Sequence, residues 1–263
     1  MNADFVSYIG SPIAAEADTR QFLWVPGTWF GPYLLDQEPM RVYHGRVDLV
    51  PRAREHTEEV AGRHGSLDFG SELEDRLVEL EIFINTFDRD LWAGLVRKIA
   101  EWFRPDGPYQ ELVLPNDPLR CLMARGAGKV SLESLAAWGR IAVPLRCKPW
   151  VFSRIEQQVT VLNGQQVQVW NDGMAPCPLR IEIKGPGANP ALTVGPDVLT
   201  WTGSLASVDT LLIDTESMVV TFNGADALSK YLGPFPYLPP RAHTNVQLSG
   251  AERAIIKYRE RWY

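Results

Sequence analysis

The second half of the chain is a succession of short apolar runs separated by turn residues, and this pattern limits the possible folds most strongly. No apolar stripe with helical spacing occurs there over a useful length. Asn-Gly, Asp-Gly and Gly-Pro pairs separate about eight candidate strands at spacings of roughly ten residues. The pattern predicts an all-β sandwich. The expected strands lie within residues 156–163, 166–172, 178–185, 192–195, 198–205, 209–217, 219–226 and 253–263.

The first half has a different character, because one segment alternates and the next has helical spacing. Residues 76–85 place Val78, Leu80, Ile82 and Ile84 on one face, which predicts a half-buried strand. The other face carries Glu79, Glu81, Phe83 and Asn85. Asp88 or Asp90 is expected to cap a helix that follows, since a carboxylate can accept from the free amides of the first turn. Its apolar stripe is formed by Leu91, Leu95, Ile99 and Trp102.

The remaining first-half elements are expected to be strands and an exposed arm. Residues 110–114 and 118–124 predict a hairpin around the Pro-Asn-Asp-Pro turn, and residues 139–149 predict a closing strand. Residues 41–51 indicate a strand pair or an edge strand, and the charged stretch 52–68 an exposed arm or loop. We therefore expect a mainly β protein with an α+β domain at 1–152 and a β-sandwich domain at 153–263.

Composition excludes several classes of protein. The chain has 263 residues, 45% hydrophobic and 22% charged, and its net charge of −6 argues against a broad basic surface for nucleic acid. Three widely spaced cysteines, Cys121, Cys147 and Cys177, have no zinc or redox spacing and are interpreted as reduced core residues. The first twenty residues do not have the pattern of a signal peptide, and no apolar run approaches the ~20 residues of a membrane helix. We expect no membrane partner.

No catalytic, cofactor or metal site is predicted. The four histidines, at positions 44, 56, 64 and 243, are scattered, and His243 lies in a proline-rich stretch expected to be a turn. Residues 125–131 lack the frame of a phosphate loop. The carboxylate pairs Glu58–Glu59 and Glu79–Glu81, and the acidic residues between 72 and 75, are interpreted as solvated, although a glycosidase that uses them stays open as a third hypothesis. The chain is therefore not expected to be an enzyme.

Aromatic residues provide the candidate contact surface. Trp170 and Trp201 are interpreted as core residues of the sandwich rather than platforms for sugars. The stretch with Trp24, Trp29, Phe30 and Tyr33 is interrupted by glycine and proline, so it is not expected to bury all of its aromatic side chains. These four residues are the predicted subunit or partner interface.

The order of motifs in residues 163–187, 199–229, 233–240 and 255–263 resembles the galectin-like domain of the siphophage distal tail protein (Dit) family. Residues 76–84, 90–103, 111–128 and 145–150 are similar to the belt domain of that family. One departure is clear: Pro240 and Arg241 stand where the family has a glycine before its last strands. The resemblance covers most of the chain.

The resemblance implies a virion structural protein without catalytic activity. Such proteins form a homohexameric ring, in which belt domains enclose a channel and galectin-like domains project outward. The ring joins the tail-tube protein to the tail-tip hub or baseplate and often carries receptor-binding proteins; it is assembled in the host cytoplasm, and DNA only passes through it. Six copies with a net charge of −6 each would carry −36, which suggests an acidic lumen. The alternative hypothesis is a carbohydrate-binding, lectin-like module for host attachment.

Overall fold

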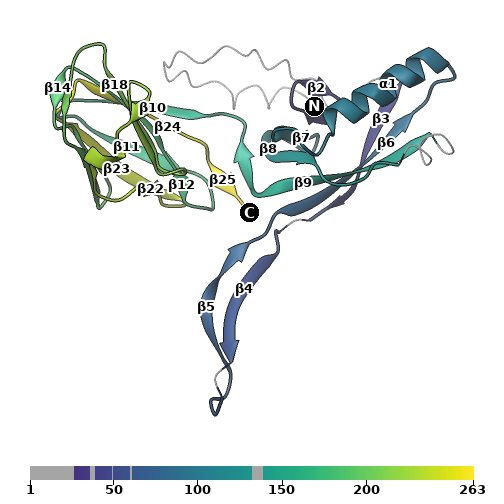
Figure 1. Cartoon of the computed structure of the whole chain (residues 1–263), viewed down its shortest axis with the longest axis horizontal. Helices are drawn as coiled ribbons and strands as arrows, with labels where there is room; N and C mark the ends of the chain where they lie inside the picture. The colour runs from purple at the N-terminus through teal and green to yellow at the C-terminus, as the bar shows by residue number, and fades with distance from the viewer. Residues whose placement is uncertain (1–26, 36–38, 49, 60, 132–138) are drawn as a thin grey trace, which may run out of the picture.

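The computed structural model describes residues 27–35, 39–48, 50–59, 61–131 and 139–263. Two lobes lie side by side, and a long hairpin projects from the first of them (Figure 1). The hydrophobic cores of the lobes are separate: one is formed by residues between Phe30 and Cys147, the other by residues between Val161 and Tyr258. The chain thus has two packing units, while the exact domain boundary at residue 152 stays a prediction.

The first lobe is one antiparallel sheet in the order β2-β1-β7-β8-β9-β6-β3, with β25 added beside β9. The strong alternation predicted around residue 80 is confirmed, because every second residue of β6 is buried. The edge strand and the hairpin of residues 110–124 are also confirmed. The strands are β1 (Trp29–Phe30), β2 (Tyr33–Leu34), β3 (Met40–Val47), β6 (Arg76–Ile84), β7 (Gln110–Leu114), β8 (Asp117–Gly126), β9 (Arg140–Ser153) and β25 (Arg261–Trp262).

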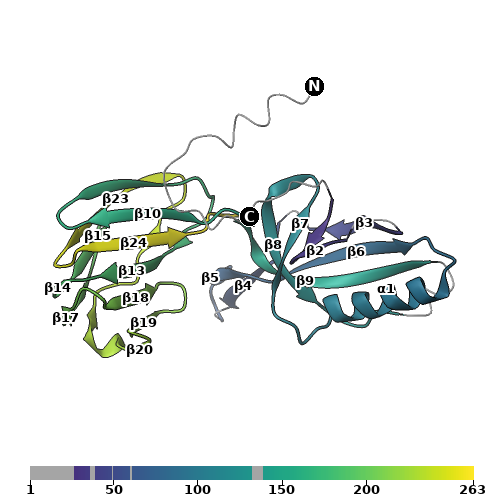
Figure 2. The same cartoon turned by 90° about the horizontal axis from the view of Figure 1, so that it is seen from above.

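Among the described residues this lobe has one α-helix, α1 (Arg89–Trp102), which covers a single face of the sheet and runs alongside β6 and β9 (Figure 2). Asp88 is its N-cap, and its carboxylate accepts from the backbone amides of Asp90 and Leu91. Leu95, Ile99 and Trp102 are buried against the sheet, whereas Leu91 at the start of the same stripe stays exposed. The other face of β6 and β9 has no helix over it in the described part of the chain.

The predicted exposed arm is a two-stranded hairpin formed by β4 (Ala53–Glu59) and β5 (Ser66–Leu73). Its residues are almost all exposed, and Figure 1 shows it extending well away from both lobes. The sequence did not predict its strands, because neither of them alternates between polar and apolar residues. Five acidic and two basic side chains give the span 53–73 a net charge of −3, with histidines counted as neutral.

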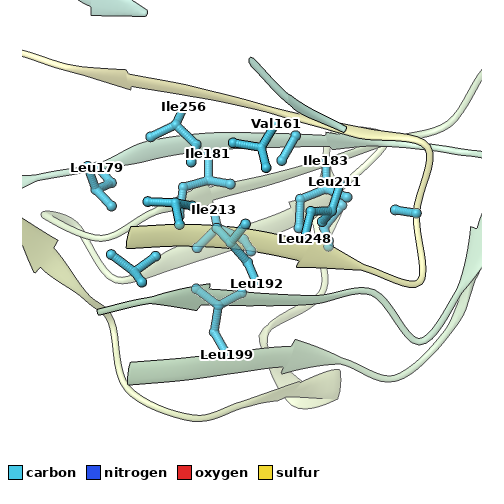
Figure 3. Packing of buried hydrophobic residues seen from close by; sticks show 14 of the residues in the cluster. Val161, Leu179, Ile181, Ile183, Leu192, Leu199, Leu211, Ile213, Leu248 and Ile256 are labelled. Atoms are coloured by element: carbon cyan, nitrogen blue, oxygen red, sulfur yellow. The ribbon is translucent and has the colours of Figure 1, made fainter. Parts of the chain in front are cut away.

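The second lobe is the predicted β-sandwich, in which a six-stranded sheet packs against a five-stranded sheet. Figure 3 shows the aliphatic side chains that meet between them, among them Ile181, Ile213 and Leu192. The first sheet has the order β10-β24-β13-β18-β19-β20, the second β11-β23-β15-β16-β21. The strands are β10 (Gln157–Leu162), β11 (Gln166–Asn171), β12 (Cys177–Pro178), β13 (Arg180–Lys184), β14 (Gly187–Ala188), β15 (Ala191–Val194), β16 (Asp197–Trp201), β17 (Ser204–Leu205), β18 (Thr210–Asp214), β19 (Val219–Phe222), β20 (Ala225–Asp226), β21 (Tyr231–Leu232), β22 (Tyr237–Leu238), β23 (Ala242–Ser249) and β24 (Arg253–Tyr258), with a short 3₁₀ helix at Leu228–Lys230.

One strand of the sandwich was missed by sequence reasoning. His243 was expected in a turn, but it lies near the start of β23, which pairs with both β11 and β15. Thr244, Val246 and Leu248 face the core, and the polar residues between them face outward. The preceding prolines, Pro239 and Pro240, had suggested a turn that extends past His243.

The chain returns to the first lobe at its C-terminal end. β25 pairs with Val151 and Phe152 of β9, so the last strand belongs to the sheet of the first lobe. Arg259, just before it, donates from Nε and Nη2 to the Ser153 carbonyl at 2.9 and 2.7 Å, and from Nη2 to Glu111 at 2.9 Å. Charge-assisted bonds of this kind fix the path of the chain between the lobes.

All three cysteines are buried and free, as expected. Burial raises the pKa of Cys121 to about 11, and those of Cys147 and Cys177 to about 12. The thiols therefore stay protonated near neutral pH and are poor nucleophiles. None of the helices in the described residues is long and apolar enough to cross a membrane.

The first prediction concerns Glu260 in the returning segment. Burial, the main cause, raises the pKa of this carboxyl, whose Oε1 accepts from the Asp172 amide at 3.1 Å. A pKa that is higher in the folded than in the unfolded state means that ionised Glu260 disfavours folding at neutral pH, and that this cost disappears on acidification. We expect Glu260→Gln, which keeps the acceptor, to raise the free energy of unfolding at pH 7 by less than about 1 kcal/mol, because solvent screens a half-buried group.

The gain should vanish below about pH 4, where the wild-type carboxyl is protonated in both states. Denaturant unfolding at a series of pH values measures it. Glu156→Gln, at an exposed carboxylate in the loop before β10, is the matched control and should leave the free energy of unfolding at pH 7 unchanged. Equal stability of Glu260→Gln and wild type at pH 7 would contradict the prediction.

The second prediction concerns Arg241, one of the two positions where the family resemblance leads us to expect a glycine. Its φ of 49° is in the left-handed region, which glycine adopts without steric cost. That conformation costs an L-residue roughly 1 kcal/mol. We expect Arg241→Gly to stabilise the second lobe by up to about 1 kcal/mol, measured as its thermal unfolding midpoint. Arg253→Gly, in the regular strand β24, should destabilise it by about 0.5–1 kcal/mol; the same sign for both variants would refute the argument.

Candidate functional site

The candidate site is a groove of about 700 Å³ in the first lobe, between α1 and the first two strands. β1 and β2 form one wall, and Pro39 and Met40 at the start of β3 form another. The two edge strands of the sheet, β2 and β3, both contribute residues to the groove beside α1, although they stand at opposite ends of the strand order. The residues that line the groove are Trp29, Pro32, Tyr33, Leu34, Pro39, Met40, Leu91, Leu95, Lys98, Glu101 and Trp102.

The predicted interface residues have different positions in and around this groove. Tyr33 is 37% exposed and stacks on Trp102, with ring centroids 4.8 Å apart. Trp29 is partly buried and also lines the groove, while its neighbour Phe30 is 1% exposed and packs on Phe103 in the core. Phe30 has no surface to offer a partner in this conformation. Trp24 lies outside the described residues.

The lining is apolar, with one charge of each sign at the rim. Leu91, 44% exposed, lies at the first turn of α1, and Lys98 and Glu101 lie further along the helix. Phe87, just before the helix, is fully exposed. Clustered apolar surface of this kind marks a protein contact more often than a solvated face. The arrangement suits an apolar protein segment.

Catalytic chemistry has little support elsewhere in the described residues. The described His, Cys, Asp and Glu residues form no group of three or more that could hold a metal ion. Glu72, one of the glycosidase candidates, has a pKa held below its usual range by the hydrogen bond and charge of Arg54, whose Nη2 lies 2.6 Å from its carboxylate. A general acid would need a raised pKa.

The two tryptophans of the sandwich behave differently from each other. Trp201 is 2% exposed and stacks on Phe222, so its assignment to the core is confirmed. Trp170 was also expected in the core, and this was wrong: it is 39% exposed on the outer side of β11. Its ring lies 4.5 Å from that of His243 on β23. The alternation in residues 166–171 could have predicted this exposure, because Trp170 falls on the same face of the strand as the polar residues Gln166 and Gln168.

Comparison with known proteins gives a match within the first lobe. Residues 42–147 match the family model described as the phage tail protein RIFT-related domain. The match includes β6, α1, β7, β8 and the projecting hairpin, and it ends within β9. No curated protein sequence matches the chain.

The fold of nearly the whole chain is that of a siphophage distal tail protein. The crystal structure of the Dit protein (gp 19.1) of phage SPP1 aligns with a TM-score of 0.66 at 14% identity, over 90% of this chain and 99% of that one. That protein is described as a paradigm of hub adsorption apparatus in phages that infect Gram-positive bacteria. A chain of the phage p2 baseplate, in its activated conformation with Ca, aligns at 10% identity with a TM-score of 0.40, over 87% of this chain and 92% of that one. The resemblance to the distal tail protein family is confirmed at the level of the fold.

Proposed function

We propose that this protein is a structural component of a siphophage tail tip, a ring-forming hub that connects the tail tube to the baseplate and receptor-binding apparatus. The observation that carries the proposal is the agreement of the whole two-lobed fold with a phage hub protein, together with the tail-protein family match in the first lobe. The protein then resides in the virion tail, after assembly in the host cytoplasm. It acts by contact and not by catalysis.

The first lobe provides surfaces that suit a ring of identical copies. A closed ring requires a heterologous contact, in which one surface of each copy meets a different surface of the next. The β4–β5 hairpin supports this role, because an isolated two-stranded ribbon is marginally stable in water and gains from a partner. The apolar groove is a second such surface, and its occupant in the proposal is a neighbouring copy of this chain.

The charge of the channel follows from which face of the first-lobe sheet lines it. The face opposite α1 carries paired opposite charges: Arg140 lies 3.8 Å from Glu81, and Arg146 lies 3.9 Å from Asp75. A channel lined by this face would have both signs and no continuous basic surface. DNA could pass it without the extensive phosphate contacts that hold a nucleic-acid-binding protein in place.

The third prediction is the ring itself. We expect the purified full-length protein to form a homohexamer, seen as a six-fold ring with a central hole in negative-stain images and as a sixfold mass in light scattering. The physical reason is that each copy carries both of the surfaces that a heterologous subunit contact requires. A protein that stays monomeric at high concentration, and that also fails to form rings with the tail-tube protein, would overturn the proposal.

The fourth prediction tests whether the groove is a contact between subunits of the ring. Leu91→Asp places a carboxylate in the groove, where burial against a partner would cost several kcal/mol, about 2 or more. The fold should tolerate it, because Leu91 is exposed and an acidic residue is favourable in the first turn of a helix. We expect the hexamer to dissociate at concentrations where wild type is assembled, as measured by light scattering across a dilution series.

The matched control is Leu162→Asp, the same substitution at a similarly exposed leucine of β10 in the second lobe. It should leave assembly unchanged. If both variants assemble like wild type, the groove is not a subunit contact, although the hub proposal would stand.

A further inference from the structure

The outer face of the five-stranded sheet β11-β23-β15-β16-β21 has an unusual composition. Strand alternation directs Val169, Val246 and Leu192 inward, and their neighbours in each strand outward. In Figure 1, β10, β24 and β18 of the opposite sheet lie along the upper side of the second lobe, and β11 and β23 lie below them. The outward residues are Gln166, Gln168 and Trp170 of β11, His243, Asn245, Gln247 and Ser249 of β23, Ala191 and Thr193 of β15, Val198 and Thr200 of β16, and Leu232 of β21.

None of these twelve residues is Asp, Glu, Lys or Arg, and the structure describes every residue of this sheet. The opposite sheet of the same lobe provides an internal comparison. Its outer face has the usual charges, and Lys257 Nζ there lies 3.2 Å from Glu182. A solvated sheet surface ordinarily carries charged residues. Exposure to solvent therefore accounts for the composition of the charged face but does not account for the absence of charged residues from the neutral face.

The polar side chains of the neutral face stand in directly opposed pairs. Trp170 is opposite His243, Gln168 opposite Asn245, and Gln166 opposite Gln247. These pairs extend over five residues of β11, about 13 Å of strand. The Tyr258 hydroxyl donates to the Trp170 carbonyl at 2.9 Å and so fixes β11 where the aromatic pair lies.

The four amide side chains are available to a ligand. Within the described part of the chain, no hydrogen bond is formed by the side chains of Gln166, Gln168, Asn245 or Gln247. Each amide carries two N–H donors and a carbonyl acceptor, so a pair of them can donate to and accept from neighbouring hydroxyl groups. Beside them, Trp170 is 39% exposed, which leaves an apolar surface for C–H groups.

This combination selects a class of ligand. A neutral face with no Lys or Arg lacks the charges that hold nucleic acids or other polyanions. Amides next to an indole suit a molecule with hydroxyl groups on its edges and C–H groups on its faces. We propose that this face binds a neutral oligosaccharide, with Trp170 and His243 as the stacking platform and the amide pairs as hydrogen-bonding partners. This goes beyond the hub function and does not depend on ring formation.

The fifth prediction tests this directly with the full-length protein. Maltohexaose, chitohexaose and a galactose hexasaccharide are titrated separately, and binding is measured by calorimetry and by tryptophan fluorescence. We expect at least one of them to bind saturably, and Trp170→Ala to weaken its affinity ~10-fold or more through loss of the stacking surface. Trp170→Phe keeps an aromatic ring and should retain part of the affinity. An unchanged thermal unfolding midpoint would show that the fold is intact.

Gln168→Ala should also weaken binding, by ~3-fold to 10-fold, as expected for loss of one or two hydrogen bonds. Gln158→Ala, the same substitution on the charged outer face of β10, is the matched control and should have no effect. The proposal is overturned if none of the three sugars binds at up to about 10 mM, or if binding survives both Trp170→Ala and Gln168→Ala. A preference for heparin over every neutral sugar would overturn it as well, since that binding requires positive charge.

Discussion

The structure depends on β9, the one strand that reaches from the core of the first lobe to the start of the second. Its first half pairs with β6 beneath α1, and its second half pairs with β8 on one side and β25 on the other. The chain therefore leaves the first lobe through β9 and comes back to the same strand after completing the sandwich. Arg259 and its bonds to Ser153 and Glu111 close this loop. Two connections at one place restrict the relative motion of the lobes more than a single linker would.

Such a restriction fits the proposed role of a structural connector. A connector has to transmit the position of one partner to the next, and a freely swinging lobe could not do that. The bonds at the junction are partly buried, where charged hydrogen bonds are weakened less by salt than at the open surface. Glu260 shows the accompanying cost, because the same burial that protects these bonds also disfavours its ionised form. The stabilising hydrogen bonds of Arg259 and the unfavourable burial of Glu260 therefore occur at adjacent positions of the junction.

The sequence predicted the local structure well where alternation or helical spacing was strong. Val78, Leu80 and Ile82 specify one face of β6, and Asp88 specifies the start of α1. It failed where the decisive contact is distant along the chain. Phe30 is buried because β1 pairs with β7, some eighty residues later, and a turn-rich segment gives no sign of that pairing. The same limit applies to β25, whose Arg261–Trp262 read as the end of a sandwich strand rather than as part of the first lobe.

The missed strand β23 shows why the candidate surfaces were harder to predict than the fold. A core position can be recognised by hydrophobicity alone, but a binding face is made by residues of several strands whose register is set in three dimensions. Trp170 and His243 are 73 positions apart, and only the pairing of β11 with β23 brings their rings together. Taken one at a time in the sequence, Trp170 is explained as a core residue and His243 as a turn residue. The neutral face becomes apparent when the outward positions of both sheets are compared, because the two faces share the same core, the same solvent and the same strand spacing but differ in charge.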